Sequence, residues 1–345
     1  MSSETDNYFL SGPTHLTVVD WSNSNHRRSV AACLVQGVYV LENDRRHRRQ
    51  GPGAAMATPW WEAFNFQLTQ IIVDDDQSYF GAVYTFTPPY PPPHHGGSGG
   101  HPPHHVVAFR GSAGKSGGRT EDFKTNIQCM LSNLHQSRRF QIALEHVSGV
   151  ASMSAAVWLT GHSLGSSLAL LIGRNFAVAP APVHLESYLF NPPFASLPIK
   201  NEKLKTGLRF ANSVLTAGLA IAAKSGAAAA GNKDSDTFAA LSTWIPYLFV
   251  NQSDTVSSEY IGYFEHREKM ESIGAGKIGR LATKHSVGSI ISAVRGKDSE
   301  PVRLIPSGYL TVHCSRSENF REAHGIHQWW KPDLELKYKL YQIKN

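Results

Sequence analysis

The residues most able to do chemistry in this sequence are a serine framed by two glycines, in Gly161-His162-Ser163-Leu164-Gly165. An apolar, strand-like run leads directly into this pentapeptide, and an apolar, helix-like run leads directly out of it. A strand-to-helix turn this sharp holds the serine in a strained conformation with its Oγ exposed, and only glycines fit two positions away on either side. The pattern therefore predicts Ser163 as a nucleophile, and the alternative is a tight turn without chemistry.

A serine hydroxyl needs a general base, and the base needs a carboxylate that orients it. Where a G-x-S-x-G turn carries a nucleophile, the acid and then the histidine follow the serine along the chain. Asp254 comes four residues after a predicted strand at 244–250, and we expect it to be the acid rather than only a turn-capping residue. Asp234 and Asp236 precede that strand, and Glu259 lies further out.

Three histidines near the C-terminus are candidates for the base, namely His313, His324 and His327. His313 falls inside a predicted strand at 310–314, whereas the other two lie in the later segment REAHGIHQWW. We predict His327, because the tryptophans that follow it can anchor the loop while its imidazole points inward. His324 is the alternative.

A second stretch, VVAFRGSAGKSGGR at 106–119, contains the Gly-Lys-Ser with which a phosphate-binding loop ends. Such a loop requires G-x-x-x-x-G-K-[ST], but phenylalanine occupies position 109, where the first glycine must stand. We therefore expect no nucleotide site.

The composition is that of a globular protein: of 345 residues, 41% are hydrophobic and 17% are charged. Part of the net charge of +6 comes from the basic cluster 45–49, which fits the C-terminal end of a helix; contact with anionic lipid is the alternative. No nucleic-acid-binding motif is present. Three scattered cysteines predict neither a disulfide framework nor a zinc site. Without a secretory signal or an apolar run of ~20 residues, we expect an intracellular, cytoplasmic protein.

Predicted strands alternate with predicted helices along the chain. Helices are expected at 24–44, 121–148 and 166–175, and strands at 80–87, 105–109, 155–160, 185–190, 244–250 and 310–314. This alternation predicts an α/β domain with a mainly parallel sheet, helices on both faces and functional residues at the carboxyl ends of the strands.

Two segments interrupt this pattern. The His/Pro/Gly-rich loop at 88–105 has histidines that could bind a metal, but we expect a solvated connection. The Ala-rich insertion at about 200–240 lies between two core strands, where a parallel topology requires a crossover. It is expected to hold a buried crossover helix, or else a cap over Ser163 that lines an acyl pocket.

Four segments together make the chain resemble the class 3 lipases, and among them an intracellular plant branch. They are FRGS at 109–112, GHSLG at 161–165, VNQSDTV at 250–256 and HQWW at 327–330. The resemblance spans most of the chain and implies one α/β-hydrolase domain over 1–345. It also implies that the backbone N–H groups of Ser112 and Leu164 form the oxyanion hole. The family's His-x-x-aromatic pattern again favours His327.

The sequence departs from that family at three points. Ser166 and Ser167 stand where Gly or Ala often follows GHSLG, Ser257 stands where a proline is usual, and the glycine-rich 113–119 replaces a helical lid. These departures concern substrate size and interfacial activation rather than the chemistry.

The resemblance implies a serine esterase or lipase that acts on a carboxylic, lipid-type ester, without a cofactor or a metal and with peripheral contact to a lipid surface. An acyltransferase that uses the same acyl-enzyme and a catalytically idle lipid-binding scaffold are the alternatives. The oligomeric state is left open by the sequence.

Overall fold

The structure is a computed structural model that describes residues 15–49, 60–88, 100–112, 134–194, 239–272 and 305–343, with a few positions between them (51, 54–55, 126–127 and 130–131). Most of the His/Pro/Gly-rich loop, the glycine-rich 113–119 and nearly all of the Ala-rich insertion lie outside the described residues. The expectations for those three segments therefore stay predictions.

The described residues form one sheet of eight strands, which lie side by side in sequence order. The strands are β1 (Phe66–Val73), β2 (Tyr79–Phe86), β3 (His105–Phe109), β4 (Val157–His162), β5 (Glu186–Phe190), β6 (Tyr247–Asn251), β7 (Gly308–His313) and β8 (Leu336–Tyr341). Strands β3 to β7 pair in parallel, while β1, β2 and β8 join the two edges by antiparallel pairing. The predicted α/β class with a mainly parallel sheet is confirmed.

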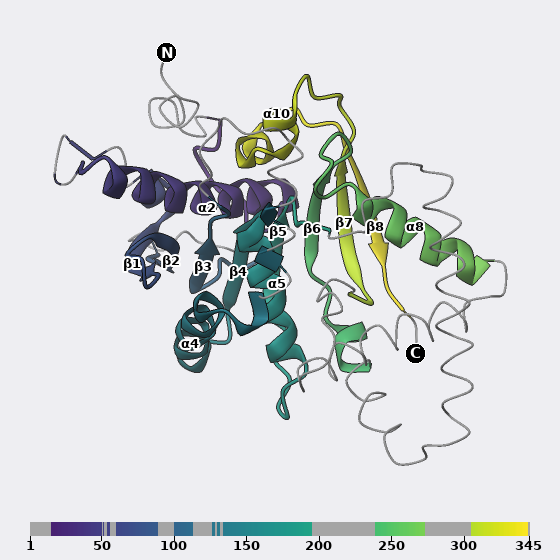
Figure 1. The fold of residues 1–345 in the computed structure, drawn as a ribbon, viewed down its shortest axis with the longest axis horizontal. Coiled ribbons are helices and arrows are strands. Elements are labelled where there is room, and N and C mark those ends of the chain that lie inside the picture. Colours follow the sequence, from purple (N-terminus) through teal and green to yellow (C-terminus); the bar gives the residue numbers. More distant parts are fainter. Residues whose placement is uncertain are drawn as a thin grey trace.

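Helices cover both faces of this sheet, as predicted (Figure 1). The α-helices are α2 (Ser24–Arg46), α4 (Arg138–Met153), α5 (Leu164–Ala177), α8 (Glu259–Ser272) and α10 (Phe320–His324), and the 3₁₀ helices are η1 (Trp60–Phe64), η2 (Leu134–Gln136) and η3 (Ile326–Trp330). One hydrophobic cluster joins the sheet to α4, α5 and α8, and a second joins it to α2, η1 and η3.

Alternate side chains of strand β3 belong to different hydrophobic clusters. Val107 and Phe109 belong to the cluster under α5, whereas Val106 and Ala108 belong to the cluster under α2. Successive side chains of a strand point to opposite faces, so a continuously apolar strand fits a sheet covered on both sides. This burial fixes the carboxyl ends of β3 and β4, from which the candidate site is built.

The sequence patterns did not predict β1, β8, α8, α10 or the 3₁₀ helices. The edge strands β1 and β8 and the helix α8 lack the buried apolar runs of the central strands; β8 is mostly exposed and carries lysines, as edge strands often do. Within the helix expected over 121–148, the described residues 126–127 and 130–131 are helical, η2 covers Leu134–Gln136, and the rest of 121–133 lies outside the described residues. Helix α4 begins at Arg138, where Ser137 caps it by accepting a hydrogen bond from the Phe140 N–H.

The basic cluster 45–49 lies at the C-terminal end of α2. Arg45 and Arg46 both pair with Glu42, and Arg49 pairs with Asp44. Cations in the last turn of a helix also interact favourably with its dipole. These contacts support the interpretation of the cluster as a helix end rather than as a lipid-binding patch.

Candidate active site

Ser163 occupies the turn between β4 and α5, with no residue to spare on either side. Its backbone is strained, with φ 53° and ψ −126°, a conformation that few residues other than glycine adopt. Side chains at the framing glycines are excluded, because a Cβ at Gly161 would collide with the Gly165 carbonyl and one at Gly165 with the Phe109 carbonyl. The strand–serine–helix turn expected from the sequence is therefore present.

Two side chains extend a chain of hydrogen bonds from this serine. The Nε2 of His324 lies 3.0 Å from the Oγ of Ser163, and its Nδ1 lies 3.0 Å from the Oδ2 of Asp254. The exposed fractions of Ser163, His324 and Asp254 are 2%, 6% and 0%. Because a carboxylate only accepts, Nδ1 carries the hydrogen, and Nε2 is left to accept the serine proton. This is the geometry of a nucleophile, its base and an orienting acid.

The prediction that His327 is the base is wrong. The alternative, His324, lies between Ser163 and Asp254. His324 is the last residue of α10, and the chain turns away at Gly325 into η3, which contains His327. The ring of His327 is half-buried and packs on Gly325, where an added Cβ would collide with it. The imidazole that is hydrogen-bonded to Ser163 is therefore that of His324.

A local signal in the sequence could have identified His324. Asn319 caps α10 by accepting the Glu322 N–H at 3.0 Å, and the carboxylate of Glu322 accepts the Glu318 N–H in return. An Asn followed three residues later by Glu, and then by Gly325, is the signature of a short helix that ends at position 324. The anchoring role expected for the tryptophans holds in part, since Trp329 is fully buried.

Asp254 lies in the loop after β6 and keeps its charge in a fully buried place. Its carboxylate accepts hydrogen bonds from the Ser257 hydroxyl at 2.6 Å, the Val256 N–H at 3.0 Å and the Asn191 amide at 2.8 Å. Burial raises the pKa of Asp254, but the electrostatic interaction and hydrogen bond with His324, and the hydrogen bonds from Ser257 and Val256, outweigh burial, so the pKa lies below its usual value. Ser257, which replaces the proline of the resembled family, thus supports the acid.

Asn191 is a site residue that the sequence reasoning missed. It follows β5 directly, has φ 46° and is fully buried. Its amide also donates to the Ala323 carbonyl at 3.1 Å, and the Trp329 indole N–H donates to its Oδ1 at 2.6 Å. Asn191 therefore ties Asp254 to the helix that carries His324. An asparagine at the carboxyl end of a predicted parallel strand was the available signal.

Gln328 holds the other side of the same loop. Its amide donates to the carbonyls of Ala323 and Gly325, both at 2.8 Å, and so satisfies groups that the end of α10 leaves open. Its Oε1 accepts from Asn251 at 2.8 Å and lies 2.9 Å from the Nδ1 of His313. His313, the third candidate for the base, is the last residue of β7, and its ring contacts the Gln328 amide.

One predicted oxyanion donor, Leu164, follows the nucleophile in the chain, and the other, Ser112, comes after the end of β3. Leu164 is the first residue of α5, where a helix leaves its N–H groups without intrahelical acceptors. Gly111 packs so closely on Ser163 that an added Cβ would lie 2.8 Å from the serine Cβ, and Ser112 follows it. The Gly111 N–H itself donates to the Tyr39 hydroxyl at 2.7 Å. Ser112 and Leu164 therefore remain the predicted donors.

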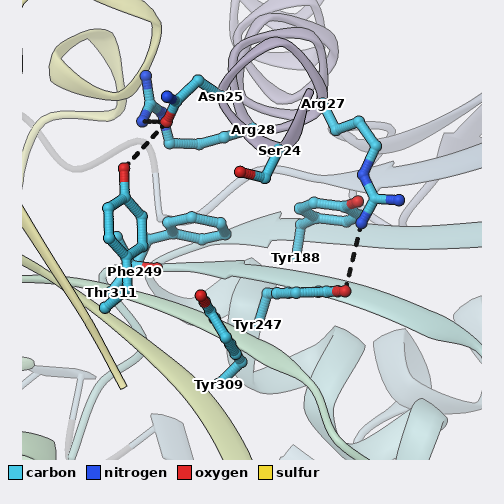
Figure 2. Close-up of a pocket in the computed structure, with 10 residues that line it drawn as sticks. Ser24, Asn25, Arg27, Arg28, Tyr188, Tyr247, Phe249, Tyr309 and Thr311 are labelled. Carbon is cyan, nitrogen blue, oxygen red and sulfur yellow. Dashed lines mark hydrogen bonds between the residues drawn. The ribbon is translucent and has the colours of Figure 1, made fainter. Parts of the chain in front are cut away.

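A cavity of about 210 Å³ lies apart from this site, between the start of α2 and the strands β5 to β8 (Figure 2). Its lining residues are Ser24, Asn25, Arg27, Arg28, Tyr188, Tyr247, Phe249, Tyr309, Thr311 and Tyr338. Arg27 pairs with Glu186, and Arg28 donates to Asn25 and to the Trp329 carbonyl. Both guanidinium groups thus have partners, although the buried Nε of Arg27 has none among the described residues. None of Ser163, His324 and Asp254 lines the cavity, so we place no substrate there.

Neither a metal site nor a membrane-spanning helix occurs among the residues that the structure describes. No cluster of three or more His, Cys, Asp or Glu side chains is arranged to hold a metal ion there. Likewise, none of the described helices combines the length and the apolar character that crossing a membrane requires.

No family model matches the sequence. The chain is similar along its whole length to a GDSL esterase/lipase of Arabidopsis thaliana, with 45% identity over 355 residues that cover 100% of each chain. The comparison supports the plant esterase or lipase part of the expected resemblance, but it gives GDSL esterase/lipase in place of class 3 lipase. The tetrapeptide Gly-Asp-Ser-Leu does not occur in this sequence, in which the serine of the triad stands in GHSLG.

Proposed function

Since this chain belongs to the GDSL esterase/lipase family, we propose that it hydrolyses carboxylic esters with Ser163 as nucleophile, His324 as base and Asp254 as the orienting acid. It is a serine carboxylic ester hydrolase. The observation that carries the assignment of roles is the unbroken hydrogen-bonded chain from the serine Oγ, through the imidazole, to a buried carboxylate. A solvent-exposed or merely structural serine has no need of such an arrangement.

The geometry supports a two-stage reaction. Ser163 attacks the ester carbonyl while His324 takes its proton, and the backbone N–H groups of Leu164 and Ser112 stabilise the tetrahedral oxyanion. His324 then gives the proton to the departing alcohol, which leaves an acyl group on the serine. Water repeats the sequence and releases the acid. Asp254, held in its charged form, keeps the imidazole oriented and stabilises the imidazolium.

The order of the triad along the chain supports an α/β-hydrolase fold that comprises 1–345 as one domain. The serine follows β4, the acid follows β6 and the histidine follows β7, all at the carboxyl ends of parallel strands. That is the order in which hydrolases with a G-x-S-x-G turn carry their triads. A lipid-type ester is the substrate class we propose, with peripheral contact to the lipid surface that presents it.

Fluorophosphonate labelling of the purified protein tests the proposal, alongside hydrolysis of p-nitrophenyl esters of graded acyl length. We expect labelling and turnover in the wild type, both lost in Ser163→Ala. The absence of labelling and of turnover on every ester in a folded wild-type protein would overturn the proposal in favour of an idle scaffold. Adding a competing alcohol and analysing the products distinguishes hydrolysis from acyl transfer, since a transferase would form the new ester in preference to the acid.

A further inference from the structure

Tyr39, in the middle of α2, lies between two parts of the active site that are distant in the sequence. Its hydroxyl accepts the N–H of Gly111 at 2.7 Å, in the turn that precedes Ser112. The same oxygen lies 2.7 Å from the Nδ1 of His162, the residue before the nucleophile. The segment that holds α10 and η3 lies against the same helix (Figure 1). One hydroxyl therefore joins the turn at Gly111 and Ser112, called here the oxyanion turn, to the turn at His162 and Ser163, called the nucleophile turn.

His162 continues this connection to the base. Its Nε2 lies 2.6 Å from the backbone carbonyl oxygen of His324. A carbonyl only accepts, so Nε2 carries the hydrogen and the neutral ring must accept at Nδ1. The Tyr39 hydroxyl is then the donor to Nδ1. The directions are thus fixed throughout: the Gly111 N–H donates to Tyr39, Tyr39 to His162, and His162 to the backbone of His324.

We propose that Tyr39 and His162 are positioning residues. They hold the oxyanion turn, and the helix α10 that carries His324, in fixed positions relative to the nucleophile turn. The inference rests on the proposed function, because it assigns these residues to the ester hydrolysis carried by Ser163 and His324. Neither side chain touches the reacting atoms in this arrangement. Their effect is on the placement of two groups that stabilise the transition state, the oxyanion donors and the imidazole.

The arrangement works only while His162 is neutral. Burial, together with the neighbouring His324 and His327, lowers the pKa of His162 to about 3, against the opposing effects of the His324 carbonyl and Asp254. Burial also raises the pKa of Tyr39 to about 12, although Arg110 opposes this, so the hydroxyl keeps its proton. The groups that face His162 thus come from α2, α10, η3 and the loop after β6.

A charged His162 would act against the reaction. Its ring centroid lies 5.1 Å from that of His324, the residue that becomes an imidazolium in the transition state. Two positive charges at this distance repel each other in a buried site. Donation from Tyr39 to Nδ1 occupies the lone pair that a proton would take, so the tyrosine also keeps His162 neutral.

Tyr39→Phe tests this, with Tyr84→Phe as the matched control. Tyr84 is fully buried, and its hydroxyl has no hydrogen-bond partner among the described residues, so the control removes the same atom without breaking a network. We expect Tyr39→Phe to lower kcat by about 10- to 100-fold with little change in KM, which is below the ~10²–10³ lost when an oxyanion donor itself is removed. The control should retain the wild-type kcat.

The pH dependence distinguishes positioning from simple packing. Without the hydroxyl, the pKa of His162 rises, so its protonation begins at a higher pH. Because the pKa of His162 is about 3 in the wild type, the ratio of wild-type to Tyr39→Phe activity is expected to stay constant near neutral pH and to grow as the pH falls towards about 4. A ratio that stays constant over this whole range, or equal losses in the Tyr84 control, would overturn the proposal.

A measurement independent of activity separates this inference from the proposed function. Histidine NMR on the inactive Ser163→Ala protein should show His162 as the neutral Nε2–H tautomer down to about pH 4, since its pKa is about 3, and Tyr39→Phe should raise the titration midpoint. An unchanged midpoint contradicts the positioning role. If the wild type hydrolyses no ester while the NMR result holds, the proposed function fails and the hydrogen-bonded chain stands.

Discussion

The Nε2 of His324 lies 3.0 Å from the Oγ of Ser163, although the two residues are 161 positions apart in the sequence. The serine is fixed by a strained turn between β4 and α5, and the histidine is fixed at the end of a helix of only five residues. So short a helix has little stability of its own. Its position depends on Asn191, Gln328 and Trp329, which join it to the ends of the central strands.

Ser163→Ala is expected to abolish ester hydrolysis and fluorophosphonate labelling while the protein remains folded, because it removes only the nucleophilic oxygen. Activity assays, labelling and the melting temperature check this. Ser167→Ala is a matched control, since it changes another buried serine of α5 and should keep both activity and labelling. Turnover retained by a clean preparation of Ser163→Ala would rule out this serine as the nucleophile.

His324→Ala is expected to lower kcat by about 10⁴-fold or more, because it removes the group that takes the serine proton. His327→Ala, three residues away, should change kcat only slightly, since its ring packs on Gly325 rather than facing Ser163. Steady-state kinetics of the two purified variants decide between them. The reverse ranking would show that the base is not the histidine hydrogen-bonded to Ser163.

Asn191→Ala is expected to lower both stability and kcat. It leaves the Trp329 indole N–H without its acceptor, and a buried polar group so orphaned costs about 1–3 kcal/mol. The Ala323 carbonyl loses one of its two donors but keeps Gln328. The substitution also removes one of the donors to Asp254. Chemical denaturation and kinetics measure the two effects.

Trp329→Phe is the control for that variant, because it removes the indole N–H but leaves Asn191 bonded to Asp254. It should lower stability with a smaller loss of kcat than Asn191→Ala. Equal losses of kcat in the two variants would show that Asn191 acts only by holding Trp329, and not through the acid.

Glu42→Gln is expected to destabilise the protein at neutral pH. Burial raises the pKa of Glu42, but hydrogen bonds from Arg45, the Tyr79 N–H and Arg46 outweigh burial and lower it from 4.5 to about 2. A carboxylate whose pKa is lower in the folded protein stabilises the fold above pH 4.5, and this contribution is lost as the pH falls towards 2. The difference between wild type and variant should therefore shrink across that window.

Urea denaturation at several pH values measures this difference. Asp75→Asn is the control, because the carboxylate of Asp75 forms an exposed pair with Arg138 at 3.7 Å, and exposed pairs contribute little to stability. Its effect should be small at every pH. A Glu42→Gln difference that stays constant from pH 7 down to about 3 would contradict the lowered pKa of Glu42.

The sequence alone determined the features that depend on local chemistry. The central strands follow from apolar runs that must be buried on both faces, as β3 shows by dividing its side chains between two cores. Ser163 follows from a pentapeptide whose glycines are the only residues that fit around so tight a turn. Asp254 follows from its place just after a buried strand. Each of these depends on neighbours within about ten residues.

Tertiary structure decided the features that depend on which distant groups meet. His324 and His327 stand in the same ten-residue segment. The local cap at Asn319 indicates that a helix ends at position 324, but the contact of that histidine with Ser163 depends on the packing of Trp329 and the hydrogen bonds of Asn191. The link from Tyr39 to His162 joins residues 123 positions apart, and nothing in either local sequence reports it. The edge strands β1 and β8 also depend on pairing with a neighbour rather than on burial. A hydrogen bond between distant segments exists only once the core has brought them together, so local sequence patterns carry no signal for it.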